Sequence, residues 1–276
     1  MNICTVLIVT YNHQNYIEKA LNSILNQETE FKYIVKIFDD CSTDKTTEIL
    51  KKYKEKYPNK IKLYINKKNK GAQANFWKAY KSVDTKYCAI LEGDDYWSNT
   101  QKLDLQINAL EKHPECSFCS HQTIIENHDK LREFSNQKPI VTNQKVLNNN
   151  IISFEDIENE EKGYISHISS RVLRMDKINI KAIKYKEAFL YDNCQYHYMF
   201  LKGKMYFINE TMSCHVQTGC GDFSSKTPYE RIEKHTKALM EFLNETNSAH
   251  REKIIKELHY FMNYYFRIME NNGENK

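Results

Sequence analysis

Several features that would assign a protein to a class are missing from this sequence of 276 residues. No apolar stretch approaches the roughly 18 residues that a membrane-spanning helix needs. The first residues lack the basic and apolar regions of a secretory signal peptide. The formal net charge of +4 is too small to indicate nucleic-acid binding. We therefore expect a cytosolic protein that does not bind nucleic acid.

The eight cysteines do not form the spaced framework of a disulfide-stabilised secreted protein. They fall inside predicted strands, turns and helices, as Cys4, Cys41, Cys88 and Cys194 do. The single CxxC pair at 116–119 is a weak zinc signal without a second pair, and period-two packing in a strand explains it better. The sequence also lacks GxGxxG and GxxxxGK[ST], so neither a dinucleotide site nor an ordinary P-loop is indicated.

The composition is 41% hydrophobic and 28% charged, which suits one large domain, or one domain with an appendage. Apolar runs and helical spacing alternate along the first half of the chain. Strands are expected at 4–10, 33–38, 61–65, from Tyr87 to Leu91 and at 116–125, with helices at 16–25, 43–53, 71–83 and 102–110. Four strand–helix units in succession imply parallel pairing, right-handed crossovers and a doubly wound α/β sheet.

The second half is less regular. We expect a polar loop or lid at 130–150, a strand or strand–turn at 164–173, a helix within 185–201, a strand at 204–215, a glycine-containing loop at 219–221, and amphipathic helices at 228–242 and 248–269. We divide the chain into a catalytic domain, 1–222, and a helical extension packed on it, 223–276. The basic and apolar residues of these last helices could instead dock on an anionic membrane or a second subunit. Membrane docking would place the protein peripherally at the inner face of the membrane.

The run from Ile90 to Trp97 is the most informative part of the sequence. A short apolar strand ends there in three carboxylates, Glu92, Asp94 and Asp95. Carboxylates this close repel one another unless a cation lies among them, and Mg²⁺ or Mn²⁺ suits oxygen ligands and substrate phosphates. The alternative is a solvated acidic turn in which Asp94 or Asp95 is the N-cap of the next helix.

Polar residues also follow the other predicted strands, at 10–12, 39–40 and 69–71. Ligands of a doubly wound sheet bind outside the carboxyl ends of its strands, so this distribution predicts a site there. Carboxylates at 39–40 could accept hydrogen bonds from a base or a ribose, although helix capping is the simpler explanation for Asp44. The glycine at a helix start, Gly71, marks either an anion site or a solvated basic surface.

Together these blocks resemble the GT-A fold glycosyltransferases of family 2. The resemblance rests on VLIVTYNHQNYIEKALNSILNQ, DDCSTDKT, NKGAQANFWKAY and LEGDDYW, whose order and spacing match over about the first 110 residues. It implies a Rossmann-like, doubly wound mixed sheet with a C-terminal helical extension. It does not specify the sugar.

The resemblance also implies roles for individual residues. Nucleotide binding falls to Thr10, Tyr11, Asn12, Asp39, Asp40, Glu92 and Gly93, with Asn69, Gly71 and Asn75 as weaker candidates. Asp94 is expected as the principal ligand of Mn²⁺ or Mg²⁺, with Asp95 in support and His215 completing the metal site. Whether Glu92 touches the metal or the ribose stays open.

The later half supplies the remaining roles. Asp192 is the expected catalytic base, with a helix N-cap as the alternative, and the expected acceptor-binding residues are Trp97, His167 and Arg171. We expect an inverting, metal-dependent transfer of a sugar from a nucleotide-sugar donor, UDP-linked by frequency, to an acceptor hydroxyl. The acceptor would be a glycan or lipid-linked glycan of a bacterial surface polysaccharide. The alternatives are a sugar nucleotidyltransferase and a catalytically degenerate nucleotide- or glycan-binding module.

Overall fold

The computed structural model describes residues 2–128, 138–158, 165–180, 183, 192–218, 227–245, 251–252 and 254–255. The chain divides into two compact units, Met1–Lys181 with Met199–Thr218, and Ala182–Tyr198 with Gly219–Lys276. The expected boundary after residue 222 stays a prediction. The packing of the C-terminal helices on the catalytic domain stays a prediction.

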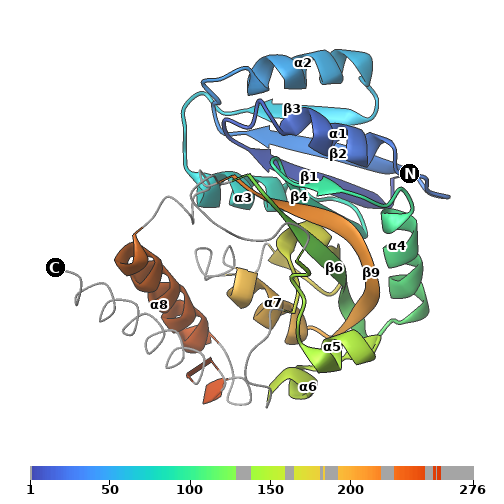
Figure 1. Cartoon of the computed structure of the whole chain (residues 1–276), viewed down its shortest axis with the longest axis vertical. Helices are drawn as coiled ribbons and strands as arrows, with labels where there is room; N and C mark the ends of the chain where they lie inside the picture. Colours follow the sequence, from blue (N-terminus) through green and yellow to red (C-terminus); the bar gives the residue numbers. More distant parts are fainter. Residues whose placement is uncertain are drawn as a thin grey trace. The chain divides into compact units, whose positions relative to one another are not determined.

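The first unit contains one mixed sheet, whose described strands follow the order β3-β2-β1-β4-β8-β6-β9-β5, with β7 paired to β9 (Figure 1). The strands are β1 (Cys4–Thr10), β2 (Tyr33–Asp39), β3 (Ile61–Ile65), β4 (Tyr87–Glu92), β5 (Tyr96–Trp97), β6 (Cys116–Asn127), β7 (Ile151–Ile152), β8 (Val172–Arg174) and β9 (Lys204–Gln217). The first four along the chain pair in parallel. β8 is antiparallel to both β4 and β6, so β6 runs in the direction of β4, and β9 pairs in parallel with β6. The carboxyl ends of β1, β2, β4, β6 and β9 therefore share one edge.

The described helices are α1 (Ile17–Leu25), α2 (Thr46–Lys56), α3 (Ala72–Lys81), α4 (Lys102–Lys112), α5 (Gln144–Asn148), α6 (Phe154–Glu158), α7 (Asp192–Phe200) and α8 (Pro228–Glu245), with a 3₁₀ turn, η1, at Ile168–Ser170. α8 belongs to the second unit, and α7 crosses from it into the first. The helix starting at Asp192 confirms the one expected within 185–201.

Helices cover both faces of the parallel part of the sheet. In α1 the apolar positions Ile17, Leu21 and Ile24 recur at helical spacing and are fully buried against alternate residues of β1, including Val6 and Ile8. Residues of α2 and α4 join the same core. α3 contacts β1 and β2 through residues outside that core, and its Trp77 and Tyr80 are buried. This two-sided cover confirms the doubly wound arrangement.

Two local expectations prove wrong. The helix expected from Thr43 begins at Thr46, because the Ser42 hydroxyl bonds to Asp39 and Asp44 accepts the Thr46 N–H at 2.9 Å. No helix starts at Asp94 or Asp95: the strand β5 follows at Tyr96, so the N-cap explanation of these acids fails. Among the described helices, none has both the length and the apolarity needed to cross a bilayer.

Some expected segments lie partly or wholly outside the described residues. These are the loop at 219–221, the residues 130–137 of the polar segment, Tyr164, and most of the helix at 248–269. The described remainder of the polar segment contains α5. Residues 251–252 and 254–255 are helical.

Candidate active site

The candidate site lies where β1 and β4 end side by side. The N–H of Gly93 donates to the carbonyl of Val9 at 3.0 Å, which continues the pairing one residue beyond β4. A Cβ atom on Gly93 would lie 2.8 Å from both Cβ and Oγ1 of Thr10 and from Nδ1 of His13. Position 93 therefore requires glycine. The short distance between the ends of β1 and β4 also fixes the positions of Asp94 and Asp95, which follow Gly93.

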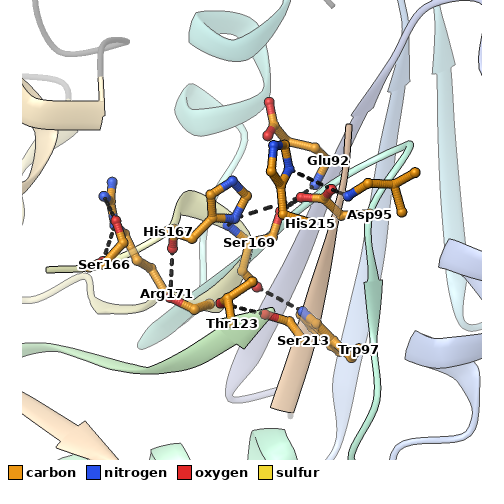
Figure 2. Close-up of polar contacts among 12 residues, drawn as sticks. Glu92, Asp95, Trp97, Thr123, Ser166, His167, Ser169, Arg171, Ser213 and His215 are labelled. Carbon is orange, nitrogen blue, oxygen red and sulfur yellow. Dashed lines mark hydrogen bonds and ion pairs between the residues drawn. The ribbon is translucent and has the colours of Figure 1, made fainter. Parts of the chain in front are cut away.

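Four side chains from distant parts of the sequence meet beyond this point (Figure 2). Glu92 ends β4, Asp95 precedes β5, His167 precedes η1, and His215 lies on β9. Each offers a ligand atom, and these atoms all lie within 4.8 Å of one another. Asp95 is central: its Oδ1 lies 3.1 Å from Nδ1 of His215, and its Oδ2 lies 3.7 Å from Nδ1 of His167.

Ser169 forms hydrogen bonds with three of the four residues of the cluster. Its hydroxyl donates to Oδ2 of Asp95 and accepts the Glu92 N–H at 3.2 Å, and its own N–H donates to Nδ1 of His167 at 3.3 Å. Its carbonyl accepts the indole N–H of Trp97 at 2.9 Å. Because Ser169 is fully buried, these bonds form in a water-poor region and hold the acids in place.

The electrostatics of the cluster favour a charged pair. Burial opposes ionisation of Asp95, but His215 and the other hydrogen bonds to Asp95 hold its pKa below the usual range. Burial alone would lower the pKa of His215, yet Asp95, Glu92 and Asp94 raise it to about 9. The carboxylates thus create a strongly negative region that a nearby cation stabilises.

Asp94 lies outside the four-residue cluster and faces His13 instead, with 3.8 Å between its Oδ2 and Nε2 of the histidine. Its expected role as the principal metal ligand stays a prediction. Burial raises the pKa of the Asp94 carboxyl and nearby Asp95 adds to this, while His13 opposes it. Asp95 thus contacts His167 and His215, whereas Asp94 contacts His13.

The paired acids at the end of β2 are engaged within the chain. Asp39 accepts hydrogen bonds from the N–H and hydroxyl of Ser42 and from the hydroxyl of Thr47. Asp40 accepts the N–H groups of Lys70 and Gly71, at 3.0 and 2.8 Å, and the amide of Asn66. Both acids are buried, so they shape the loops around the site, and their contact with a nucleotide stays a prediction.

At the end of β1, Tyr11 and Asn12 are exposed and Thr10 is buried. Tyr11 is 40% exposed and has the one aromatic ring among the residues expected to bind nucleotide. Asn12, at φ 57°, uses its side chain to accept the Thr43 N–H at 2.8 Å and so joins the first and second loops. Thr10 is buried, and its hydroxyl has no hydrogen-bond partner among the described residues.

Residues 69–75, at the start of α3, also include both exposed and buried positions. Asn69 is exposed and accepts the Gly71 N–H at 2.8 Å, and Gly71 takes the left-handed φ of +85° that glycine permits. Asn75 is buried, donates to the carbonyl of Phe38 and accepts from Asn66. Asn69 and Gly71 can therefore reach a ligand more readily than Asn75.

The expected acceptor-binding residues make contacts within the chain, and their role towards an acceptor stays a prediction. Trp97 and Arg171 are buried, and their polar groups bind Ser169 and Ser166, so both support the site from within. His167 belongs to the four-residue cluster. Asp192 begins α7 in the second unit, but its side chain lies outside the described residues, and its catalytic role stays a prediction.

Sequence reasoning missed His13 as part of the site, and it placed Ser169 beside His167 on the acceptor side without connecting it to Asp95. His13 follows the polar residues at the end of β1. This position was the only signal in the sequence that His13 belongs to the site. Ser169 shares a segment with His167, but nothing local to that segment indicates contact with Asp95, 74 residues earlier.

The donor set of the cluster suits a divalent cation. Two carboxylates and two imidazoles offer the oxygen and nitrogen ligands that Mn²⁺ and related ions accept. Its position, outside the carboxyl ends of parallel strands, is where doubly wound sheets bind nucleotides. The residues present thus fit a metal bound to a diphosphate.

Comparison with known proteins shows the family to which this fold belongs. The family model described as "Glycosyl transferase family 2" matches residues 5–175. The chain is 31% identical over 166 residues to the putative teichuronic acid biosynthesis glycosyltransferase TuaG of Bacillus subtilis, covering 59% of this chain and 65% of TuaG. It is 37% identical over 132 residues to an uncharacterized protein of Mycobacterium tuberculosis, covering 47% of this chain. The chain spans only 38% of the length of that mycobacterial relative.

Solved structures show the same fold. The crystal structure of Staphylococcus aureus TarS 1–349 in complex with UDP-GlcNAc superposes with a TM-score of 0.68 at 21% identity, covering 99% of this chain and 75% of that one. The mannosyltransferase PcManGT from Pyrobaculum calidifontis, in complex with GDP-Man and Mn²⁺, gives a TM-score of 0.60 at 14% identity, covering 93% and 69%. The expected GT-A fold is confirmed, and with the family model covering most of the chain, this protein belongs to glycosyl transferase family 2.

Proposed function

We propose that the protein is an inverting, metal-dependent glycosyltransferase that uses a nucleotide-sugar donor in the synthesis of a bacterial surface glycan. The observation that carries the proposal is the cluster of Glu92, Asp95 and His215 with His167 at the carboxyl edge of a family 2 fold. UDP is the favoured nucleotide, since a structural neighbour is TarS with UDP-GlcNAc. TuaG, a relative in sequence, is named for teichuronic acid biosynthesis.

The residues at the sheet edge would divide the work of holding the donor. The exposed ring of Tyr11 can stack against a base, while Asn69 and Gly71 are exposed at the start of α3, where a helix N-terminus favours an anionic ligand. Asp95, Glu92 and His215 would hold Mn²⁺ or Mg²⁺. When bound, such an ion neutralises charge that develops on the departing diphosphate.

The acceptor side rests on the family resemblance alone. Asp192 would take the proton of the acceptor hydroxyl as it attacks the anomeric carbon from the face opposite the diphosphate. General-base catalysis of this kind typically contributes ~10²–10⁴-fold. The acceptor is a glycan or a lipid-linked glycan, and docking of the C-terminal helices on a membrane or a second copy of the chain belongs to the same proposal.

Thermal unfolding with UDP, GDP, dTDP and CMP, each with and without Mn²⁺, tests the proposal. A ligand present at about one hundred times its dissociation constant adds ~2.7 kcal/mol, which moves the midpoint by several degrees. We expect a shift with UDP that requires the metal. A UDP shift of equal size without metal would overturn metal dependence, and no shift with any nucleotide would favour the degenerate binding module.

A further inference from the structure

His167 lies within the acidic cluster rather than on the acceptor side. Its Nδ1 is 3.7 Å from Oδ2 of Asp95, its ring centroid is 4.4 Å from that of His215, and its side chain is only 7% exposed. We infer that His167 is a second nitrogen ligand of the metal ion, and that the site selects a first-row transition ion over Mg²⁺. This inference rests on the metal-dependent transfer proposed above.

The size of the cluster supports a shared ion. Ligand atoms around one ion at about 2.1 Å lie at most about 4.2 Å apart when they face each other across it. The four ligand atoms lie within 4.8 Å of one another, so the two that are farthest apart need to approach by roughly half an ångström to face each other across one ion. Side-chain rotation suffices for that, since His215 is partly exposed and Glu92 ends its strand.

The nature of the ligands determines the preference. Mg²⁺ keeps several waters and takes oxygen ligands in near-ideal octahedral geometry. Imidazole nitrogen suits transition ions, whose affinity rises from Mn²⁺ towards the later first-row metals. A site with Asp95 alone would bind Mg²⁺. Two histidines beside Asp95 lower the affinity for Mg²⁺ relative to that for Mn²⁺, Co²⁺ or Zn²⁺.

Capping of η1 is the competing role for this histidine. Nδ1 of His167 accepts the Ser169 N–H at 3.3 Å, which is long for such a bond. A neutral imidazole has one acceptor nitrogen, so the cap and the ion compete for the same lone pair if Nδ1 is the ligand. Asparagine is a good N-cap residue but lacks the imidazole, so His167→Asn separates the two roles.

The experiment measures Mn²⁺ binding directly, with and without UDP. Electron paramagnetic resonance titration gives the affinity, electron spin-echo modulation counts coordinated ¹⁴N nuclei, and competition with Mg²⁺ gives the selectivity. The proteins are wild type, His167→Asn, His167→Ala, and His113→Asn, the last replacing a histidine at the end of α4 outside the cluster.

We expect two coordinated imidazoles in the wild type and one in His167→Asn, with at least about tenfold weaker Mn²⁺ binding and a reduced preference over Mg²⁺. His113→Asn should match the wild type. One imidazole in the wild type, or unchanged Mn²⁺ affinity in His167→Asn, would overturn the inference while leaving metal-dependent transfer intact. Absence of Mn²⁺ binding by the wild type, with or without UDP, would overturn both.

Discussion

Nδ1 of His215 lies 3.1 Å from Oδ1 of Asp95, although 120 residues separate them in the sequence. The contact arises because β5 pairs with β9, placing Tyr96 opposite Cys214, so the residues flanking this pair are neighbours. The N–H of Val216 donates to the same carboxylate oxygen at 2.9 Å. Asp95 therefore contacts His215 only when β9, the last strand along the chain, has paired with β5.

The first prediction separates the two aspartates. Asp95→Asn should abolish the metal-dependent stabilisation by UDP, because the carboxylate that contacts both histidines is lost. Asp94→Asn should retain Mn²⁺ binding, since Asp94 lies outside the cluster. Thermal unfolding with Mn²⁺, and with Mn²⁺ plus UDP, measures both effects. Loss of Mn²⁺ binding in Asp94→Asn with retention in Asp95→Asn would restore Asp94 as the principal ligand.

Gly93→Ala should destabilise the protein. The added Cβ meets Cβ of Thr10 at 2.8 Å, an atom tied to the backbone of β1 that cannot rotate away. Overpacking of this kind typically costs about 1–3 kcal/mol. Urea unfolding monitored by circular dichroism measures the loss. A change within about 0.5 kcal/mol would show that the ends of β1 and β4 separate easily.

Asp40→Asn tests whether the Asp40 carboxylate stabilises the folded protein in the absence of a ligand. The carboxylate accepts the N–H groups of Lys70 and Gly71, and an amide NH₂ placed against those donors leaves a buried group unsatisfied. The expected cost is about 1–3 kcal/mol without any nucleotide present. Glu55→Gln, on the exposed side of α2, is the control and should stay within about 0.5 kcal/mol. Unchanged stability of Asp40→Asn would assign the acid to ligand binding alone.

Most of the fold could be predicted because its signals are local. The apolar runs of β1 and β3 end where the strands end, at Thr10 and Ile65, and the order and spacing of the four blocks are enough to indicate the family. The position of the site followed from a general property of parallel sheets. The helix begins at Thr46 rather than at Thr43, because the side chains of Ser42 and Asp44 bond to Asp39 and to the Thr46 N–H, and these contacts are not visible in the sequence.

The contents of the site were harder to predict. Which of Asp94 and Asp95 faces inward depends on the antiparallel pairing of β5 with β9, and that long-range pairing leaves no trace in the acidic block. Trp97 and Arg171 have side chains that often bind sugars, but both are buried, and β5, which carries Trp97, packs against α1 and β9. Residue type alone does not indicate this burial, and the acceptor-binding role of both residues stays a prediction.

Lys102 should make stability depend on pH. Burial lowers the pKa of this lysine from 10.5 to about 7. In unfolded chains it binds its proton up to about pH 10.5, whereas in the folded protein it loses the proton near pH 7. The unfolded state thus holds more protons across this range, and the contribution of Lys102 to stability rises with pH between these values.

The measurement compares Lys102→Met with the wild type by urea unfolding at intervals from about pH 6 to about pH 10. The difference in unfolding free energy should shift in favour of the wild type as the pH rises, by up to about 1.4 kcal/mol for each unit of pKa difference. Lys102→Met also removes the hydrogen bond from Nζ of Lys102 to Gln106, which is 2.6 Å long. The free-energy cost of this loss is constant, so it does not change the slope of the difference against pH. Lys51→Met, on an exposed position of α2, should show no slope. A flat difference for Lys102→Met would place the folded-state pKa near its ordinary value.

Asp192→Asn tests the proposed catalytic base. The amide keeps the size of the side chain and its ability to cap α7, but it cannot take a proton from an acceptor hydroxyl. The rate of sugar transfer should fall ~10²–10⁴-fold, while metal-dependent stabilisation by UDP survives, because the metal and nucleotide residues lie elsewhere in the chain. Activity can be followed as UDP release with a supplied acceptor, and the unfolding midpoint with UDP and Mn²⁺ is the control. Loss of UDP binding with a proportionate loss of rate would assign Asp192 to the donor site, and an unchanged rate would leave it as a helix cap.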